Sequence, residues 1–529
     1  MRQLSGNDAR FLYSDTAHSN ANITKIQIYD QSTARGGKVR FKSILSHIEG
    51  RLDRSPIFRQ RLHRVPLELD YPYWIEDENF DLEYHVRHIA LPKPGDWRQF
   101  CIQASRIHAR PLDLSRPLWE IYVIEGLDGF LDLPADSFAL LTKVHHAAID
   151  IKGGNITTLL HDTTPSPPAA EPPAPWFPEP PPGRAAMLMR GLGNNITSPF
   201  RFARAIARLA PSAFTLAGDI LLRPERIVAT RFNAAVSAHR VFETRRFLLA
   251  EFKAIRPLVA GATVNDVVLA VCGGALRRYL EGERELPAAS LTAIAPYYIR
   301  RGDGAPVDKP AMSWVRVQLG TDIADPVRRL AHVHAQTAAS ETIAQAIGAR
   351  ELTDIGSFTP SVTLALTSKM LGRAAAGSGR RAPLAHCTIT NVPGPSAPLY
   401  MCGARMTYFS AIMPIADGMG LVFAVTSYDG RIIISPTSCR ELMPDPAQFA
   451  QCIRDSFQEY LGLAQASATA SPKPRRTREA ARPARSLRPG PIRGSSSGTA
   501  PPKRPQARTA ATAPPAGPGD RQRHKARAH

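Results

Sequence analysis

Residues 138–154 read Phe138-Ala-Leu-Leu-Thr-Lys-Val-His145-His146-Ala-Ala-Ile-Asp150-Ile151-Lys-Gly153-Gly154. An apolar, β-rich run ends here in two adjacent histidines, and an acid follows four residues after the second histidine. Neighbouring side chains on a strand point to opposite faces, so only one of the two histidines can face a given cavity. A neutral imidazole at such a place can remove a proton from a hydroxyl group, and a nearby carboxylate can hold its tautomer. The segment therefore predicts a general-base site at a strand end.

Three other interpretations of this segment compete with general-base catalysis. The histidines could be a structural pair whose hydrogen bonds are all satisfied. A metal site would need a third ligand, and no further His or Cys stands at a useful spacing nearby, so we predict no metal. His145 and Asp150 also form the H-x4-D signature of membrane glycerolphosphate acyltransferases, but the downstream Glu-Gly-Thr-Arg block of those enzymes is absent from this sequence.

Four further blocks lie before and after the two histidines. They are Leu4–Tyr13, Pro111–Glu120, Val264–Ala270 and Thr390–Pro395. Together with His145-His146-Ala-Ala-Ile-Asp150, which is similar to an HHxxxDG motif, they resemble the wax ester synthase/diacylglycerol acyltransferase family. That family stands within the wider superfamily of chloramphenicol acetyltransferase, carnitine acyltransferases and condensation domains. The resemblance covers residues 1 to about 465.

The resemblance implies an α/β (α+β) fold of two chloramphenicol-acetyltransferase-like lobes, each a mixed sheet with helices, with an active-site tunnel between them. It also implies an O-acyltransferase that moves a long-chain acyl group from acyl-CoA, the co-substrate, to diacylglycerol or a long-chain alcohol, with no further cofactor. The catalytic group would be His145, His146 and Asp150, with His146 as general base and Asp150 as a structural partner. The implied substrate-binding or wall residues are Pro117, Leu118, Trp119, Asn265, Asp266, Thr390 and Asn391.

Each of these other blocks also has a structural interpretation. Pro117 to Trp119 could be the entrance of a strand with a core tryptophan. Asn265 and Asp266 could cap a buried helix over Thr263–Leu280, and Asn391–Pro395 has the composition of a turn. Further elements that the pattern predicts are strands over 25–29 and 138–144, helices over 97–109 and 199–209, and a hairpin over 421–435 that turns at Asp429-Gly430.

Two changes of composition divide the chain. Ten prolines fall between Thr163 and Gly183, which is typical of an extended spacer. We therefore expect an N-terminal lobe over 1–162, a proline-rich crossover over 163–184, a C-terminal lobe over 185–465 and a disordered basic tail over 466–529.

The charge of the chain is concentrated in that tail. The whole sequence of 529 residues carries a net charge of +20. Residues 471–529 hold 15 Lys or Arg against two acids, which gives +13 and leaves +7 for the rest. The tail lacks aromatic residues, so its composition favours a solvated extension or contact with acidic lipid headgroups over specific nucleic-acid binding.

The remaining features concern the setting of the protein. The six cysteines are widely spaced, and no run of about 18 apolar residues occurs, which disfavours a disulfide scaffold and a membrane span. We expect a cytoplasmic protein that associates peripherally with the inner face of the membrane or with lipid inclusions. Ile151 stands where the family motif has glycine, so the alternative function is a catalytically impaired member that binds a lipid or membrane surface.

Overall fold

The computed structural model describes residues 1–127, 133–134, 136–149, 156–166, 175–194, 228–298, 312–347, 385–395 and 397–470. These residues all belong to one compact unit, Met1–Ser471. Asp150, Ile151 and the two glycines that follow them in the motif segment lie outside the described residues, and so do the predicted helix over 199–209 and residues 471–529 of the predicted tail. Residues 466–470, predicted as the start of that disordered tail, are instead the last residues of a helix.

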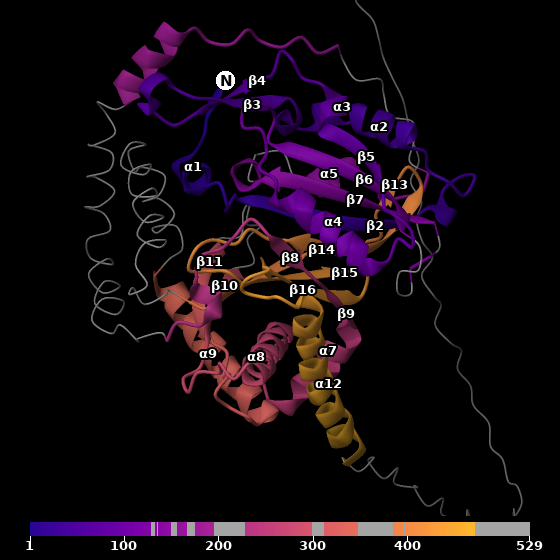
Figure 1. Ribbon diagram of the computed structural model, residues 1–529, viewed down its shortest axis with the longest axis vertical. Coiled ribbons are helices and arrows are strands. Elements are labelled where there is room, and N and C mark those ends of the chain that lie inside the picture. The colour runs from indigo at the N-terminus through magenta and orange to yellow at the C-terminus, as the bar shows by residue number, and fades with distance from the viewer. Residues whose placement is uncertain are drawn as a thin grey trace, which may run out of the picture. The chain divides into compact units, whose positions relative to one another are not determined.

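The first large sheet holds the strand that ends at His145 (Figure 1). Its central pair is antiparallel and runs in register from Asn22 opposite His145 to Tyr29 opposite Phe138. Both predicted strands are thereby confirmed. The strand order is β13 (Tyr400–Met401), β14 (Ala404–Ile412), β2 (Asn22–Asp30), β7 (Ser137–His145), β6 (Trp119–Leu127) and β5 (Val86–Ala90), and only the β5–β6 pair is parallel.

The second large sheet is also mixed. Its order is β11 (Met312–Gln318), β10 (Thr292–Tyr298), β12 (Cys387–Pro393), β15 (Val422–Tyr428), β16 (Arg431–Cys439) and β8 (Arg240–Phe242), with β9 (Arg245–Leu248) also paired to β16. The β15–β16 hairpin confirms the prediction, because Asp429 and Gly430 both have the positive φ that a tight hairpin turn needs. The turn predicted to begin at Asn391 is wrong over its first three residues. They continue β12 and pair in parallel with β15, so the ladder outweighs their turn-like composition.

Helices cover the sheets, and a small sheet lies beside the first. That sheet consists of β1 (Arg2–Gln3), β4 (Tyr73–Glu76) and β3 (Gln60–His63). The helices include α1 (Gly6–Ser14), α2 (Phe41–Glu49), α3 (Leu82–His85), α4 (Trp97–Ala109), α5 (Ile156–Leu160), α7 (Leu249–Ile255), α8 (Val264–Gly282), α9 (Pro326–Ile347) and α12 (Pro446–Ala470), and residues 184–194 are helical as well. The helix predicted over 97–109 is confirmed to the residue. The mixed sheets and their helices confirm the predicted two-lobed α/β architecture.

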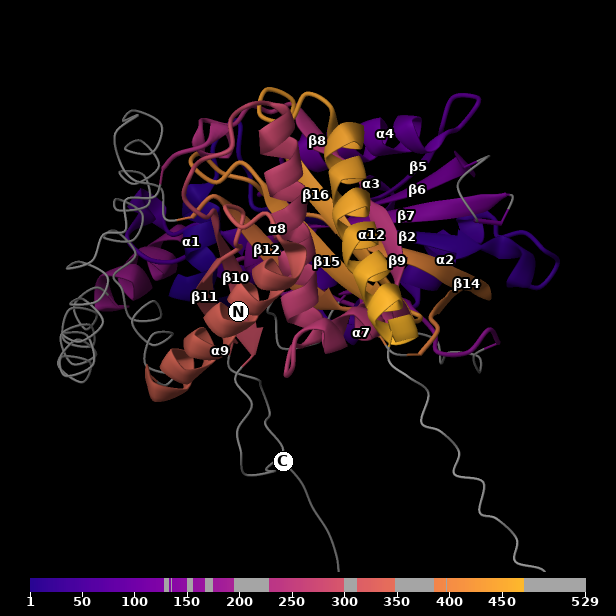
Figure 2. The same ribbon diagram turned by 90° about the horizontal axis from the view of Figure 1, so that it is seen from below.

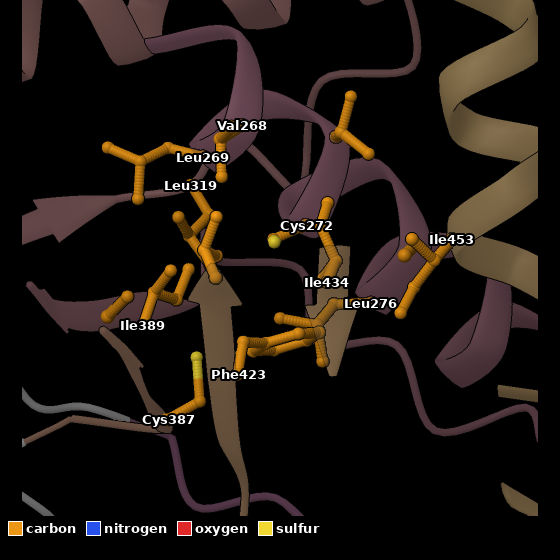
Figure 3. Packing of buried hydrophobic residues seen from close by; sticks show 14 of the residues in the cluster. Val268, Leu269, Cys272, Leu276, Leu319, Cys387, Ile389, Phe423, Ile434 and Ile453 are labelled. Carbon is orange, nitrogen blue, oxygen red and sulfur yellow. The ribbon is translucent and has the colours of Figure 1, made fainter. Parts of the chain in front are cut away.

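Helix α8 is the predicted buried helix, and it packs with α12 against one face of the second sheet (Figure 2). Its apolar residues meet Phe423 and Ile434 from the sheet and Ile453 from α12 (Figure 3). Burial of one such side chain contributes about 1.5–3 kcal/mol, so this face fixes the helix on the sheet. Gly273 and Gly274 allow the close approach, since a Cβ there would collide with the Leu319 carbonyl or the Ser456 hydroxyl.

The two sheets are joined through β14. Its backbone pairs with β2 in the first sheet, although it follows the second sheet's β12 in the sequence. The Thr426 hydroxyl of β15 donates to the Phe409 carbonyl of β14 at 2.7 Å. Sheet membership therefore does not follow chain order at this point, and the predicted lobe boundaries remain a proposal. Within the described ranges, no helix is long and apolar enough to span a membrane.

Candidate active site

The two histidines lie where β7 ends and a single 3-10 turn, His146–Ala148, begins. Neighbouring backbone fixes this strand end on both sides. The His145 N–H donates to the Leu118 carbonyl at 3.0 Å, and the His146 N–H donates to the Ala21 carbonyl at 2.8 Å. The chain leaves the strand between the two histidines, so their side chains have different surroundings.

The ring of His145 is buried and both of its nitrogens are engaged. Its Nδ1 accepts a hydrogen bond from the Ala147 N–H at 3.2 Å, which means that Nδ1 carries no proton. Its Nε2 then donates to the Asp15 carboxylate at 3.1 Å. With its only lone pair occupied, this ring is a structural support for the turn rather than a free base.

His146 has the opposite character. Its ring stacks on Phe11 with centroids 3.7 Å apart, and its Nδ1 is buried without a hydrogen-bond partner among the described residues. Burial lowers the pKa of His146 from 6.5 to about 4, mainly by desolvation and in smaller part through the nearby Arg10 and His145. The imidazole is therefore neutral at neutral pH and keeps a lone pair that can accept a proton.

Helix α1 supplies the residues that surround the histidines. Ser5 caps its N-terminus by accepting from the Asp8 N–H at 3.1 Å. The Arg10 guanidinium lies 4.7 Å from the centroid of the Phe11 ring. Phe11 is the residue that stacks with His146. At the far end of the helix, Asp15 accepts from the Ala21 N–H at 2.8 Å and also binds His145. One carboxylate thus ties the helix end, the β2 entrance and the first histidine together.

Neither Phe11 nor Asp15 is among the site residues predicted from the sequence. Phe11 falls inside the Leu4–Tyr13 block, but a motif block does not say which side chain touches the site. Asp15 lies 130 residues from its histidine, and no local spacing links the two. Only the tertiary fold brings the short N-terminal helix α1 next to the end of β7.

Pro117, Leu118 and Trp119 lie at the entrance of β6, beside the histidine strand, and all three are buried. The Trp119 indole donates to the Phe58 carbonyl at 3.1 Å and stacks on His85 at 4.5 Å. These contacts place the tryptophan in the core of the first lobe, where it supports the strand that holds His145.

The predicted residues of the second lobe lie at the start of α8 and on β12. Thr263 and Asp266 form a reciprocal capping box, and the buried Asp266 carboxylate also accepts from His334 at 2.9 Å and Thr337 at 2.7 Å. Thr390 is buried on β12, and the neighbouring Asn391 and the half-buried Asn265 show no side-chain hydrogen bond among the residues described. The described contacts do not bring these second-lobe residues to His146.

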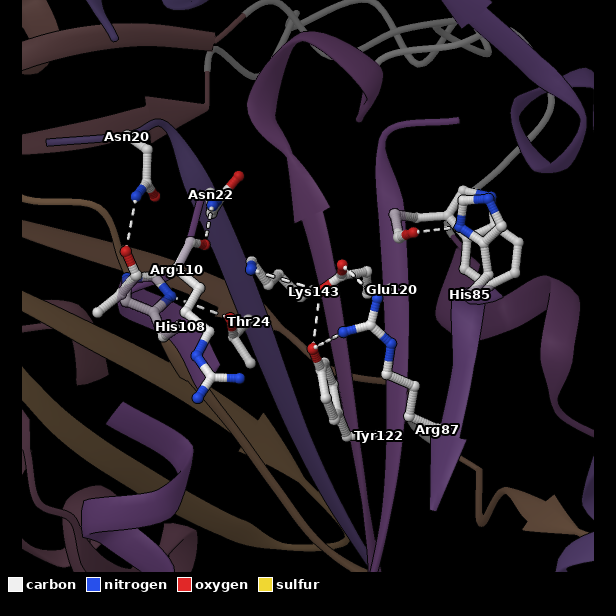
Figure 4. Close-up of polar contacts among 12 residues, drawn as sticks. Asn20, Asn22, Thr24, His85, Arg87, His108, Arg110, Glu120, Tyr122 and Lys143 are labelled. Carbon is white, nitrogen blue, oxygen red and sulfur yellow. Dashed lines mark hydrogen bonds and ion pairs between the residues drawn. The ribbon is translucent and has the colours of Figure 1, made fainter. Parts of the chain in front are cut away.

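A buried charged network includes Lys143 of β7 (Figure 4). Lys143 and His145 are two residues apart on this strand, so their side chains leave it on the same face. The fully buried Lys143 ammonium is 3.5 Å from the Glu120 carboxylate, which also accepts from the Tyr122 hydroxyl at 3.0 Å. Desolvation lowers the pKa of Lys143 to about 8. In the described part of the chain, no cluster of three His, Cys, Asp or Glu side chains is placed to hold a metal ion.

Comparisons with known proteins identify the family of the chain. Residues 4–268 match the wax ester synthase/diacylglycerol acyltransferase catalytic domain, and residues 311–460 match the WS/DGAT C-terminal domain. A Mycobacterium tuberculosis protein named "Putative diacyglycerol O-acyltransferase Rv1760" is 31% identical over 474 residues, 87% of this chain and 90% of that protein. The "O-acyltransferase WSD" of Acinetobacter baylyi is 30% identical over 408 residues, 74% of this chain and 83% of that protein.

Solved structures show the same fold. A wax ester synthase/diacylglycerol acyltransferase from Marinobacter aquaeolei has a TM-score of 0.60 at 24% identity, over 88% of this chain and all of that chain. The first condensation domain of the calcium-dependent antibiotic synthetase has a TM-score of 0.51 at 14% identity, over 88% of this chain and 96% of its own. The family matches and the curated relatives together show that the chain belongs to the wax ester synthase/diacylglycerol acyltransferase family.

Proposed function

We propose that this protein transfers a long-chain acyl group from acyl-CoA to the hydroxyl of diacylglycerol or of a long-chain alcohol, with His146 as general base. The observation that carries the proposal is the pairing of a fully engaged His145 with a neutral His146 whose Nδ1 has no hydrogen-bond partner among the described residues. The family membership and the names of the relatives support the same reaction. The product would be a triacylglycerol or a wax ester.

The reaction is a single displacement. A nitrogen of His146 takes the proton of the acceptor hydroxyl while the oxygen attacks the thioester carbonyl carbon. The tetrahedral intermediate then collapses, the carbon–sulfur bond breaks, and the CoA sulfur leaves with the proton that the imidazolium returns. No acyl-enzyme is formed. His145 and Asp15 contribute by holding the turn that carries His146.

Other residues keep the roles proposed from the sequence. Asp150 remains a candidate structural partner of the histidines. Asn265, Thr390 and Asn391 remain candidates for the opposite wall or for donors to the developing oxyanion. The capping bonds of Asp266 and the burial of Pro117, Leu118 and Trp119 support positioning roles for these four rather than direct contact with substrate.

The direct test follows thiol release by purified protein given a long-chain acyl-CoA. Diacylglycerol or hexadecanol should each be offered as acceptor, and a reaction without acceptor measures simple hydrolysis. Acceptor-dependent thiol release that disappears in His146→Ala supports the proposal. Thiol release no faster than in His146→Ala, with lipid binding intact, would support the impaired, lipid-binding alternative that Ile151 raised.

We further propose that the protein works at an anionic membrane or lipid-droplet surface through its basic tail. The +13 charge of residues 471–529 supports this, because each basic group near such a surface contributes about 1 kcal/mol before screening by salt. Deletion of these residues should weaken sedimentation with anionic vesicles at low salt. Turnover of soluble substrates should stay the same, and equal binding to neutral vesicles would exclude the electrostatic attraction.

A further inference from the structure

A cavity of about 680 Å³ lies between α4, β8 and the start of α12. One face of α4 forms a wall, since Arg98, Cys101, Ile102, Ser105, Arg106 and Ala109 recur at helical spacing along it. The volume is in the range of about 300–1,000 Å³ that is typical of small-molecule sites. The cavity is therefore large enough to hold a ligand and is separate from the ring of His146.

The cavity is lined by five arginines. Four of them, Arg98, Arg106, Arg110 and Arg440, are exposed and form no ion pair with any residue in the described ranges. The fifth, Arg240, is buried, and its guanidinium donates to the carbonyls of Ser237 and His18. Four exposed arginines that have no ion-pair partner among the described residues therefore line one hollow.

The acids of the same wall are already engaged. Glu243 accepts from the Thr244 N–H at 2.8 Å and from the Trp97 indole, and it lies 3.5 Å from Arg245. Asp445 accepts from two backbone N–H groups at the start of α12, at 3.0 and 3.1 Å. Neither carboxylate forms an ion pair with the four exposed arginines in the described structure. The hollow keeps a net positive charge and suits an anion with several phosphates.

The cavity is linked to the candidate active site through the end of α4. The Asn20 amide donates to the Ala109 carbonyl at 3.1 Å, and the Asn22 amide donates to the Arg110 carbonyl at 3.2 Å. Asn22 in turn is the register partner of His145 on β7. Figure 4 shows the Arg110 side chain directed away from Asn22. One hydrogen bond thus connects Arg110, which lines the cavity, to Asn22, the residue opposite His145.

We propose that this cavity binds the phosphate groups of coenzyme A, so that the nucleotide end of the acyl donor is held by arginines from α4 and from the end of β16. The inference rests on the proposed acyl transfer for the choice of ligand. Guanidinium groups form paired hydrogen bonds to phosphate oxygens, and several such pairs would anchor a ligand whose thioester end must reach His146.

Isothermal titration of the full-length protein with coenzyme A tests the proposal without requiring turnover. The test variant is Arg98→Gln/Arg106→Gln/Arg440→Gln, and Arg35→Gln, an exposed arginine outside the cavity, is the matched control. We expect the triple variant to bind coenzyme A at least about tenfold more weakly at low salt, with the control within about twofold of wild type. The single variant Arg106→Gln should show a smaller loss in the same direction. Dephospho-coenzyme A should bind wild type more weakly than coenzyme A does.

Two results would overturn the proposal. One is equal affinity of wild type and triple variant for coenzyme A while both remain folded by circular dichroism. The other is arginine-dependent binding to phosphatidylglycerol vesicles without any binding of coenzyme A, which would assign the arginines to a lipid surface. The proposed function is judged separately. If coenzyme A binding depends on the arginines but no thiol is released, the binding site is supported and the proposed acyl transfer is refuted. If acyl transfer occurs but the arginine variants bind coenzyme A as wild type does, the transfer is supported and the binding site is refuted.

Discussion

Each lobe contains a histidine hydrogen-bonded to a carboxylate from a distant part of the chain. In the first lobe, the buried His145 binds the partly exposed Asp15 at 3.1 Å. In the second, the buried Asp266 binds the partly exposed His334 at 2.9 Å. The distances are alike, but the buried partner is the imidazole in one pair and the acid in the other.

The surroundings of each pair decide its use. Asp266 accepts from the Thr263 backbone, from His334 and from Thr337, so its oxygens serve to join the start of α8 to α9. His145 is equally saturated, but its neighbour in sequence, His146, is neutral, and its Nδ1 has no hydrogen-bond partner in the part of the chain that the structure describes. A His–Asp pair is therefore no sign of catalysis by itself. What distinguishes the first lobe is the second histidine that the pair supports.

The largest expected effect is on the rate of acyl transfer, and it distinguishes His146 from His334. His146→Ala should lower acyl transfer by about 10²–10⁴, the usual contribution of a positioned general base. His334→Ala should leave the specific activity within about twofold, because that ring only bonds a capping acid. Thiol release at saturating acyl-CoA measures both, with folding checked by circular dichroism. Wild-type turnover in His146→Ala would remove the basis of the mechanism.

A smaller loss of activity is expected when the support of the histidine turn is removed. Asp15→Ala deletes the acceptor of His145 and of the Ala21 N–H, and a small displacement of His146 should reduce kcat by roughly 10- to 100-fold. Asp15→Asn keeps only one of the two acceptor oxygens, so it should recover part of the rate. KM should change little in both variants. Wild-type kcat in Asp15→Ala would show that this carboxylate does not position His146.

Disruption of the Asp266–His334 pair should lower the stability of the protein and leave the rate of acyl transfer unchanged. Asp266→Ala removes the capping box and the acceptor of the His334 ring, and Thr337 keeps only its bond to the His334 carbonyl, so the free energy of unfolding should fall by about 2–4 kcal/mol. The neighbouring Asn265→Ala is the control, with an expected cost under about 0.5 kcal/mol. Urea denaturation measures both. A loss of activity without a loss of stability in Asn265→Ala would instead favour its proposed place in the active-site wall.

Local patterns were sufficient for most secondary structure. The helix Trp97–Ala109, the β15–β16 hairpin and the capped α8 each carry their own signals: helical spacing, Asp429-Gly430, and Thr263 before an apolar run. The prediction was wrong at Asn391, where pairing with β15 overrides turn composition. The insertion of β14 into the first sheet also has no local signal, because strand partners across nearly 400 residues are chosen by packing.

The sequence predicted only part of the candidate site. The motif identified His145 and His146, and strand alternation predicted that they would have different surroundings. It could not say which nitrogen of His145 is occupied, because that depends on the Ala147 backbone and on Asp15. The arginine-lined cavity beside α4 could not be predicted from the sequence either, since Arg240 and Arg440 reach it from β8 and the end of β16.

The smallest expected effect concerns pH. A histidine with its usual pKa of 6.5 would lose half of its base form at that pH, whereas the pKa of His146 is lowered to about 4 by desolvation. The plot of log(kcat/KM) should therefore stay nearly flat from pH 8 to 6 and fall only toward pH 4, because this limb reports the base in the free enzyme. The stability that neutral His146 contributes is complete above pH 6.5, where both folded and unfolded states are unprotonated, and it is lost as the pH falls from 6.5 toward 4.

Arg10 provides the matched variant for this last prediction. Its positive charge lowers the pKa of His146, so Arg10→Gln should move the acid limb toward higher pH while the plateau rate stays close to wild type. His334 is the counterpart in the second lobe, and its replacement should leave the acid limb in place. Circular dichroism at each pH separates titration from acid unfolding. An acid limb centred at pH 6.5 in wild type and in Arg10→Gln alike would mean that the titrating base is solvated, and that the buried ring against Phe11 is not the group that takes the proton.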